Sequence, residues 1–566
     1  MSSGPVIDTQ VLIAGAGPVG LTLAIDLGRR GVRCLLIEEQ DEPRKLPKME
    51  RCNARSMEIY RRLGLADAIR DAGAPPHTRM DSVVVTSMAE EPLVRLVYPT
   101  VEELKAATAA CNDGSMPREP AQLVSQYTLE PLLARVAERT PNVTVRTGCA
   151  LRSLTQDDEC VTAQVETTMG QHETIRASYL VGTDGGRSTV RKQLGIALQG
   201  EGGLARKNQV FIRCDRLWDV CPYPQGRMYF FTNQDQSILS MQDSLRHFVF
   251  HTSCWGDHAE LRQLSGETLG LPVDFEILAT TGWTLHLLVA ERYMDRRVFV
   301  AGDAVHLVIP TGGLGLNTGI CDAIDLSWKL AATLAGWGGP WLLPSYEIER
   351  RAIGLRNREA SRYAAYGQVA WRSAVRPNIS EDTPEGRGVR AAVTRLASFE
   401  QRKTHELLGT ELGYRYEASP LLCAEPEPWI PDVKEIYIPT ARPGARLPHV
   451  WLADGTALHD RIGDNFTLLK LRGDADDTAG LERAMRELNA PLQLLELDDR
   501  VAREICGRDL VLVRPDLHVA WRGNEAPDDP RSVAATVTGH VADKTSPNEA
   551  VAAETPAPAK KQALDW

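Results

Sequence analysis

The sequence lacks a basic block, a long apolar run and regularly spaced cysteines. Its formal net charge is −11, whereas nucleic acids and acidic membrane surfaces favour clustered lysine and arginine. The first apolar run, VLIAGAGPVGLTLAIDL, has no Lys or Arg before it and is interrupted by three glycines and Asp26. These features argue against a signal peptide and a transmembrane helix. We therefore expect neither nucleic acid nor a membrane as a partner.

The eleven cysteines include no Cys-x-x-Cys pair and no Cys/His cluster with metal-ligand spacing. This pattern is typical of reduced, mostly buried thiols, and it predicts a cytoplasmic protein without a metal site. The chain has 566 residues, of which 43% are hydrophobic. That length is sufficient for two to four globular domains, each with its own core.

A nucleotide-binding corner is predicted near the N-terminus. Residues 8–14 form an apolar strand pattern, GAGPVG follows at 15–20, and residues 21–30 have helical periodicity that ends at Gly31. In this order Gly15 permits the tight turn, Gly17 lets the backbone approach a pyrophosphate, and Gly20 lets the helix pack on the strand. The sequence predicts an ADP-containing dinucleotide at this corner.

Glu38 ends the second predicted strand, 23 positions after Gly15. An acidic residue about 20 positions after the first glycine accepts hydrogen bonds from ribose hydroxyls. It would also repel the 2′-phosphate of NADP at this site. The motif leaves both NAD and FAD open.

Two further corners favour FAD. A strand at 179–181 runs into Asp184-Gly185, and Ser188 or Thr189 is placed to cap a short helix. A strand at 298–301 ends in Gly302-Asp303; a glycine-rich turn follows, and a helix is predicted over 320–334. FAD needs such additional contacts, because a carboxylate can hold its ribityl chain and backbone N–H groups can reach its ring.

Here the sequence resembles a known family. GAGPVG at 15–20, GTDGGRSTVR at 182–191 and AGDAVHLVIPTGGLGLNTGICDAIDLSWKL at 301–330 are similar to the FAD-dependent aromatic hydroxylases. These are single-component (class A) flavoprotein monooxygenases of the para-hydroxybenzoate and phenol hydroxylase type. The resemblance covers residues 8–370. Lys48 stands where many members have Arg, so a bidentate contact would become a point charge.

The resemblance adds Arg55, in Arg-Ser-Met-Glu, and Gln126, in Gln-Tyr-Thr-Leu-Glu, to the predicted site. Pro310 is predicted to lie at the junction of flavin and substrate, where oxygen is transferred. No catalytic base is predicted, and His306 is expected to be structural or near the ribityl chain. The full set of predicted cofactor-binding residues is Gly15, Gly17, Pro18, Gly20, Glu38, Glu39, Lys48, Arg55, Gln126, Asp184, Gly302, Asp303, Pro310, Gly313, Gly315, Leu316 and Asn317.

The resemblance implies that NADPH or NADH reduces FAD and that the reduced flavin takes up O2. A flavin C4a-hydroperoxide would then hydroxylate a small phenolic or aromatic substrate. NAD(P)H would bind only transiently, because the sequence has no second strand-linked GxGxxG. The family habit implies a homodimer or a higher oligomer.

The fold class predicted is α/β. A Rossmann-like FAD-binding domain of the glutathione reductase type is expected at 1–75, 120–200 and 290–375. Alternating strand patterns at 76–119 and 205–289 predict an inserted β-rich substrate domain. Within it, eight polar or aromatic residues are candidates for substrate contact, although packing or surface roles are favoured for each: Arg213, Tyr223, Tyr229, His247, His251, Trp255, Trp283 and His286.

The last third of the chain predicts a helical connector at 376–435 and a small domain at 440–525. Strands at 466–471 and 509–513 flank a helix at 480–488, which resembles the thioredoxin-like appendage of phenol hydroxylases. Cys506 has no partner at redox spacing, so no reductase activity is expected. The composition of 526–566 predicts a disordered tail.

Alternative functions remain open. Epoxidation or hydroxylation of a polyketide-like ring system uses the same scaffold. A flavin halogenase is less favoured, because its Trp-x-Trp-x-x-Ile-Pro motif is missing from the nearest segment, Thr-Gly-Trp-Thr-Leu-His-Leu-Leu at 281–288. A binding protein without catalysis is the alternative from another class, and three intact flavin corners argue against it.

Overall fold

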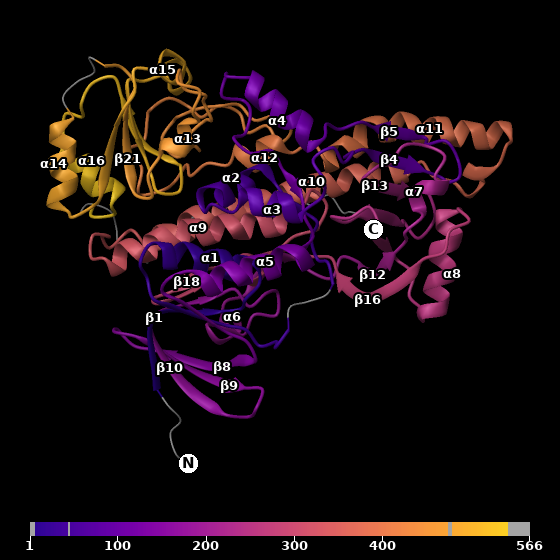
Figure 1. The fold of residues 1–566 in the computed structure, drawn as a ribbon, viewed down its shortest axis with the longest axis horizontal. Helices are drawn as coiled ribbons and strands as arrows, with labels where there is room; N and C mark the ends of the chain where they lie inside the picture. Colours follow the sequence, from indigo (N-terminus) through magenta and orange to yellow (C-terminus); the bar gives the residue numbers. More distant parts are fainter. Residues whose placement is uncertain (1–5, 43–45, 474–477, 542–566) are drawn as a thin grey trace.

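The computed structural model describes residues 6–42, 46–473 and 478–541. The chain forms three sheet-based parts joined by two long helices, α9 (Leu314–Leu334) and α10 (Pro344–Arg372). The four-stranded C-terminal part and the seven-stranded sheet with its helix α8 lie at opposite ends of the molecule (Figure 1). The eight-stranded N-terminal sheet lies between them, on the other side of α9.

The eight-stranded sheet has parallel strands at its centre. β1 pairs in parallel with both β10 and β2, and β10 pairs in parallel with β19. Strands buried on both faces are expected to be apolar throughout, as Val11, Leu12 and Ile13 of β1 are. The strands are β1 (Val6–Ala14), β2 (Cys34–Ile37), β7 (Val143–Arg146), β8 (Cys149–Gln156), β9 (Val161–Thr167), β10 (His172–Gly182), β18 (Met294–Asp295) and β19 (Val298–Val300).

The predicted strand–turn–helix–strand unit is present. β1 is followed by α1 (Pro18–Arg29), and Gly31, with φ of +82°, stands between this helix and β2. The predicted short helix α6 (Thr189–Gln193) has Ser188 as its N-cap, and the Ser188 hydroxyl accepts a hydrogen bond from the Arg191 N–H. Helix α1 packs against both α5 (Gln126–Arg139) and α9 beside the sheet.

The seven-stranded sheet joins two segments that are far apart in sequence. Its order is β16-β12-β15-β14-β13-β4-β5, so β4 and β5 from 76–119 lie beside strands from 205–289. One face packs into an apolar core that includes Val210, Phe248 and Leu261 of α8 (His258–Leu269). The strands are β4 (Ser82–Val85), β5 (Val94–Leu96), β12 (Arg206–Arg213), β13 (Met228–Phe231), β14 (Ile238–Met241), β15 (His247–Thr252) and β16 (Glu276–Thr284).

Helices connect this sheet to the C-terminal part. α10 is followed by η2 (Pro377–Ser380), α11 (Pro384–Glu400), η3 (Gln401–Thr404) and α12 (Leu408–Leu412). The C-terminal sheet has the order β22-β21-β23-β24, with α14 and α15 between its strands. Its elements are β21 (Phe466–Lys470), α14 (Ala479–Glu487), β22 (Leu492–Glu496), α15 (Arg500–Cys506), β23 (Leu510–Val513) and β24 (Val519–Gly523).

The prediction of a disordered tail at 526–566 is wrong for the first part of this segment. Residues 530–537 form α16 (Pro530–Val537), whose Asp529 cap accepts a hydrogen bond from the Ser532 N–H. Val533, Ala534 and Val537 are buried in the same core as Leu481 of α14. The polar composition concealed an amphipathic helix that completes this core. The remainder of the predicted tail, 542–566, lies outside the described residues.

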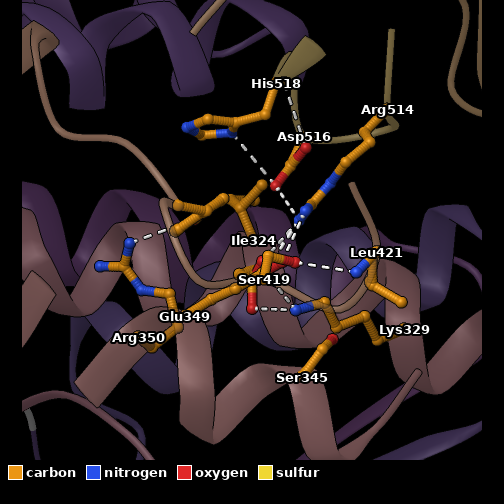
Figure 2. A network of polar contacts seen from close by, with 12 residues as sticks. Ile324, Lys329, Ser345, Glu349, Arg350, Ser419, Leu421, Arg514, Asp516 and His518 are labelled. Carbon is orange, nitrogen blue, oxygen red and sulfur yellow. Dashed lines mark hydrogen bonds and ion pairs between the residues drawn. The ribbon is translucent and has the colours of Figure 1, made fainter. Parts of the chain in front are cut away.

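A buried polar network fastens the C-terminal part to α9 and α10 (Figure 2). Arg514, just after β23, donates to Glu349 Oε1 of α10 at 2.6 Å. Lys329 of α9 donates to the other Glu349 oxygen at 2.6 Å. These groups are buried, and Asp325 and Asp516 supply the further negative charges that the two cations need.

Candidate functional site

One large cavity begins at the carboxyl ends of β1, β10 and β19 and continues to a face of the seven-stranded sheet. Its volume is about 1680 Å³, whereas small-molecule sites usually measure about 300–1,000 Å³. Part of its wall comes from the C-terminal half of α10 and from η3. The three predicted corners therefore meet at a single cavity, although they are far apart in sequence.

The glycines of the first corner have distinct surroundings. Gly15 has φ of +109°, and a Cβ there would lie 2.5 Å from the Thr183 carbonyl oxygen. A Cβ on Gly20 would lie 2.0 Å from the Gly15 carbonyl oxygen, so this glycine permits close packing of helix on turn. A Cβ on Gly17 would meet no atom within 4 Å. Gly17 thus leaves an open cradle at the N-terminus of α1, where a diphosphate is favoured.

Glu38 is held in the cavity wall beside this cradle. Its Oε2 accepts a hydrogen bond from the Ala16 N–H at 2.8 Å, and its Oε1 accepts one from the Gln40 N–H at 3.1 Å. Each oxygen keeps a further lone pair that can accept a ribose hydroxyl. The geometry fits the role predicted from its spacing to Gly15.

Asp184 supplies an acceptor without a protein partner. Its Oδ2 accepts hydrogen bonds from the Thr189 and Val190 N–H groups at the start of α6. Its Oδ1 is buried at the cavity and has no hydrogen-bond partner among the described residues. Buried carboxylate oxygens are rarely left unpaired. A hydroxyl of a bound dinucleotide would satisfy this one.

The glycine-rich segment before α9 forms a tight turn. Gly302, Gly312 and Gly313 have φ of +64°, +90° and +66°, in the left-handed region that favours glycine. Gly313 is the N-cap of α9, which begins at Leu314 and not at 320 as predicted. Gly315, Leu316 and Asn317 therefore lie in the first turn of the helix.

This helix start directs free donors at the cavity. The first N–H groups of a helix have no partner within it, and their end of the helix favours negative charge. Gly315 and Leu316 line the cavity, and Pro310 and Asp303 lie on the same wall. The Asp303 carboxylate is exposed there and makes no hydrogen bond to a described residue. The arrangement fits a flavin ring and its polyol chain.

Asn317 lines the cavity, but its side-chain amide is used within the protein. Its oxygen accepts from the Asn53 N–H at 2.9 Å and from the Ser56 hydroxyl at 2.7 Å. Its Nδ2 donates to the Gly313 carbonyl at 2.6 Å. Asn317 therefore ties α9 to α2 (Ala54–Arg62) and shapes the turn.

The predicted cofactor role of Arg55 stays a prediction, and the structure places this side chain outside the cavity. Arg55 does not line the cavity; it is buried and donates to the Tyr414 hydroxyl at 3.2 Å and to the Asp516 carbonyl at 2.7 Å. Gly20 and Gly302 also lie behind the wall and act through backbone geometry. The predicted residues that do line the cavity are Gly15, Gly17, Pro18, Glu38, Glu39, Lys48, Gln126, Asp184, Asp303, Pro310, Gly313, Gly315, Leu316 and Asn317.

His306 is structural. Its Nε2 lies 3.0 Å from Asp322 Oδ2, which also accepts a hydrogen bond from the Gly302 N–H at 3.1 Å. The second Asp322 oxygen accepts from Arg350 Nε at 2.8 Å. All of these groups are buried. Asp322 thus holds the Gly302–Asp303 turn on α9 and α10.

The opposite wall is one face of the seven-stranded sheet. Lys207 and Gln209 of β12 and Ile238 and Ser240 of β14 line the cavity at alternate positions, as the two-residue period of a strand requires. Of the eight predicted candidates, only His251, Trp283 and His286 line it. The side chains that sequence reasoning missed include Tyr98, Lys207, Gln209, Arg227, Tyr366, Arg372 and His405.

These missed side chains give the sheet end a basic character. Burial, with Arg372 as a second cause, lowers the pKa of Lys207 to about 8. Burial lowers the pKa of His251 to about 4 and that of His405 well below its usual range, so both are neutral at pH 7. Arg227 forms an ion pair with Glu50 at 2.6 Å.

Comparison with known proteins decides the family. Residues 8–361 match the model of an FAD binding domain, and residues 440–541 match that of the aromatic-ring hydroxylase C-terminal region. The chain belongs to the family of FAD-dependent aromatic-ring hydroxylases. FAD is the cofactor of this aromatic-ring hydroxylase, and the enzyme is a monooxygenase.

Relatives of this aromatic-ring hydroxylase match it over nearly its whole length. The FAD-dependent monooxygenase apdD of Emericella nidulans is 33% identical, covering 91% of this chain and 87% of its own. Aklavinone 12-hydroxylase RdmE of Streptomyces purpurascens is 31% identical, covering 95% and 99%. The structure of RebC with bound 7-carboxy-K252c superposes with a TM-score of 0.87 at 32% identity, covering 95% and 100%.

Residues 6–42, 46–473 and 478–541 contain neither a membrane-spanning helix nor a metal-ligand cluster. No helix in these ranges has the length and apolar character needed to cross a bilayer. No group of three or more His, Cys, Asp or Glu side chains within them is arranged to hold a metal ion.

Proposed function

We propose that the protein hydroxylates a multi-ring aromatic compound of polyketide type, with NADPH or NADH as reductant and O2 as the source of oxygen. The observation that carries the proposal is the single cavity that joins the FAD corners to the face of the seven-stranded sheet. At about 1680 Å³, it exceeds the usual small-ligand site of about 300–1,000 Å³. It therefore has room for a large substrate beside the flavin.

Relatives support this substrate class. Aklavinone 12-hydroxylase is named for its action on aklavinone, and RebC was solved with 7-carboxy-K252c bound. The tailoring-oxygenase alternative is thus favoured over a hydroxylase of single-ring phenols. Epoxidation by the same scaffold remains an outcome that product analysis would distinguish.

Each wall of the cavity has a separate task in this proposal. The Gly17 cradle and Glu38 hold the ADP half of FAD, and Asp303 holds the ribityl chain. The first turn of α9 donates backbone N–H groups to the ring edge, and Pro310 lies where ring and substrate meet. When bound and reduced, FAD supplies the oxygen atom that it takes from O2.

The chain's apolar side chains exclude water from the transfer position. Met228 and Ile238 project from the sheet, and Val369 projects from α10 into the same cavity. Exclusion of water from this position prevents hydrolysis of reactive intermediates and other side reactions. No ionisable side chain of the wall is assigned as a base.

We also propose that the C-terminal part is a thioredoxin-like domain without redox activity. Its order of β21, α14, β22, α15, β23, β24 and α16 supports this assignment. Cys506 is buried, and burial raises the pKa of its thiol to about 12, so a thiolate is not formed at neutral pH. The domain then serves to pack on α9 and α10. The predicted homodimer stays a prediction.

The test uses purified holoenzyme. We expect a yellow protein that oxidises NADPH or NADH faster with a polycyclic phenol such as an anthracyclinone aglycone than with single-ring phenols. Under 18O2 the product should gain one labelled oxygen. Incorporation of halide in place of oxygen, or a reductant oxidation rate that no aromatic compound increases, would contradict the proposal.

A further inference from the structure

Two cations at the sheet end of the cavity have only neutral hydrogen-bond partners. Lys207 of β12 donates to Gln236 Oε1 at 3.1 Å and to Ser253 Oγ at 2.7 Å. Arg372, the last residue of α10, donates to the Phe231 carbonyl at 2.7 Å. Neither forms a salt bridge with a carboxylate of the described residues. Both side chains line the cavity.

Lys207 and Arg372 donate hydrogen bonds to the same turn of the seven-stranded sheet. Phe231 and Gln236 lie at the two ends of the β13–β14 turn, which is closed by a hydrogen bond from the Phe231 N–H to the Ser237 carbonyl at 3.0 Å. Burial lowers the pKa of Lys207, and the Arg372 charge lowers it further, with Asp235 acting in the opposite direction. Burial also lowers the pKa of Arg372 to about 9. Such depressed values mark cations that lack a counter-charge.

The adjoining wall has donors without acceptors. Arg372 Nη2 and the Trp283 indole N–H are buried and have no partner among the described residues. Trp283 lies opposite Lys207 in the register of β16 and β12. A buried donor left unpaired is unfavourable, because it has lost its hydrogen bonds to water. A ligand that brings acceptor oxygens would remove this cost for both groups.

We propose that Lys207 and Arg372 bind the negative charge of an anionic aromatic substrate, either a carboxylate or an ionised phenol, beside Trp283. The proposal deepens the proposed function, on which it rests, by naming the charge of the substrate. The FAD diphosphate is not the anion, because its cradle at Gly17 lies in the turn between β1 and α1, whereas Lys207 and Arg372 lie at the seven-stranded sheet. Truncating one partner of a desolvated charge pair weakens binding by tenfold or more.

The experiment measures binding to the FAD-loaded enzyme by calorimetry, without turnover. Three naphthols serve as probes: neutral 2-naphthol, the carboxylate 3-hydroxy-2-naphthoate, and 2,4-dinitro-1-naphthol, which is ionised at neutral pH. We expect at least one anion to bind about tenfold more tightly than 2-naphthol. The preferred anion identifies which source of charge the site accepts.

Three variants test whether Lys207 and Arg372 cause the preference for an anion. Lys207→Met should abolish the preference for the anion and leave 2-naphthol binding unchanged. Arg372→Gln, which keeps a donor for the Phe231 carbonyl, should do the same. Lys192→Met, at an exposed position of α6, is the control and should keep the preference. Flavin content and the thermal midpoint of Lys207→Met should not fall, because the lysine is an uncompensated cation in the free enzyme.

The outcomes separate the two proposals. Equal or weaker binding of both anions by the wild type would overturn the anion site, as would full anion preference in both cavity variants. Anion binding that the variants abolish, without hydroxylation of any aromatic compound tested, would support the anion site and overturn the proposed function.

Discussion

Asp303 stands in the cavity with its carboxylate free of hydrogen bonds to described residues. Its removal therefore breaks no hydrogen bond or ion pair among the described residues. We expect Asp303→Ala to weaken FAD binding by about tenfold or more, since hydrogen bonds to charged groups contribute about 1.5–3 kcal/mol. The ratio of flavin absorbance to protein after gel filtration measures the loss. Asp71→Ala, at an exposed position of α3 (Ala66–Ala72), is the control; full flavin occupancy in Asp303→Ala would refute the assignment.

Substitution by alanine should have different effects at Gly17 and at Gly20. At Gly17 a Cβ meets nothing within 4 Å and φ is −68°, so Gly17→Ala should keep the stability of the apoprotein. It should nevertheless lose FAD, because the methyl group would occupy the cradle. At Gly20 the Cβ would lie 2.0 Å from the Gly15 carbonyl oxygen. Gly20→Ala should therefore cost at least about 1–3 kcal/mol of apoprotein stability in urea unfolding. Equal stability losses in the two variants would contradict this division of roles.

At the scale of elements, Asp322 connects the turn at Gly302 to two helices. Burial alone would raise its pKa, but Arg350 and His306 hold the pKa of this carboxyl below its usual value. Asp322→Asn would leave the Arg350 charge buried without its carboxylate. We expect a loss of about 3–5 kcal/mol in unfolding free energy together with weaker FAD retention. Asp67→Asn, exposed on α3, should change neither quantity.

The elements that could be predicted are those with a local signal. The β1–α1–β2 unit follows from apolar periodicity and the placement of glycines, and these act within a few residues. The start of α9 was misplaced because Gly315 and Asn317 look like turn residues. Their helical conformation depends on Gly313 as a left-handed cap and on the hydrogen bonds that Asn317 accepts from Asn53 and Ser56 at the start of α2. Such contacts join segments about 260 residues apart and leave no local pattern.

The same difference between local motifs and long-range contacts explains which residues of the candidate site could be predicted. Corner residues such as Gly15, Glu38 and Asp303 were found because each belongs to a motif that is continuous in sequence. Lys207 and Arg372 reach one place only after β12 and α10 pack around the cavity. Arg55 lies outside the cavity because the helical motif that carries it faces the C-terminal part in this protein, where Tyr414 and Asp516 accept its hydrogen bonds.

At the scale of the whole molecule, buried charges connect the separate sheets. Burial opposes ionisation of Glu349, yet Arg514 and Lys329 hold its pKa well below the usual range (Figure 2). The C-terminal part supplies Arg514, whereas α9 and α10 supply the other two. Breaking one such buried pair is expensive because it leaves a charge uncompensated. We therefore expect the three parts to unfold together rather than in succession.

Glu58 of α2 offers the sharpest test of this coupling. Its carboxylate accepts hydrogen bonds from Arg446 of the C-terminal part, with Nε to Oε2 at 2.8 Å, and from the Arg118 N–H at 2.8 Å. Burial would raise its pKa, but Arg446 and His459 lower it from 4.5 to about 2. The unfolded chain thus binds a proton more readily, so the contribution of Glu58 is complete above pH 4.5 and declines as the pH falls toward 2.

Glu58→Gln should lose on the order of 3 kcal/mol of unfolding free energy at pH 7, from a pKa shift of this size. Its stability should also decline less steeply than that of the wild type between pH 4.5 and 3. Urea unfolding across this range, followed by both flavin release and Trp fluorescence, measures the two effects. Because Glu58 links α2 to the C-terminal part, both probes should shift together in the variant. A fluorescence transition that separates from flavin release, or an unchanged acid slope, would show that Arg446 does not couple the C-terminal part to the FAD-binding fold.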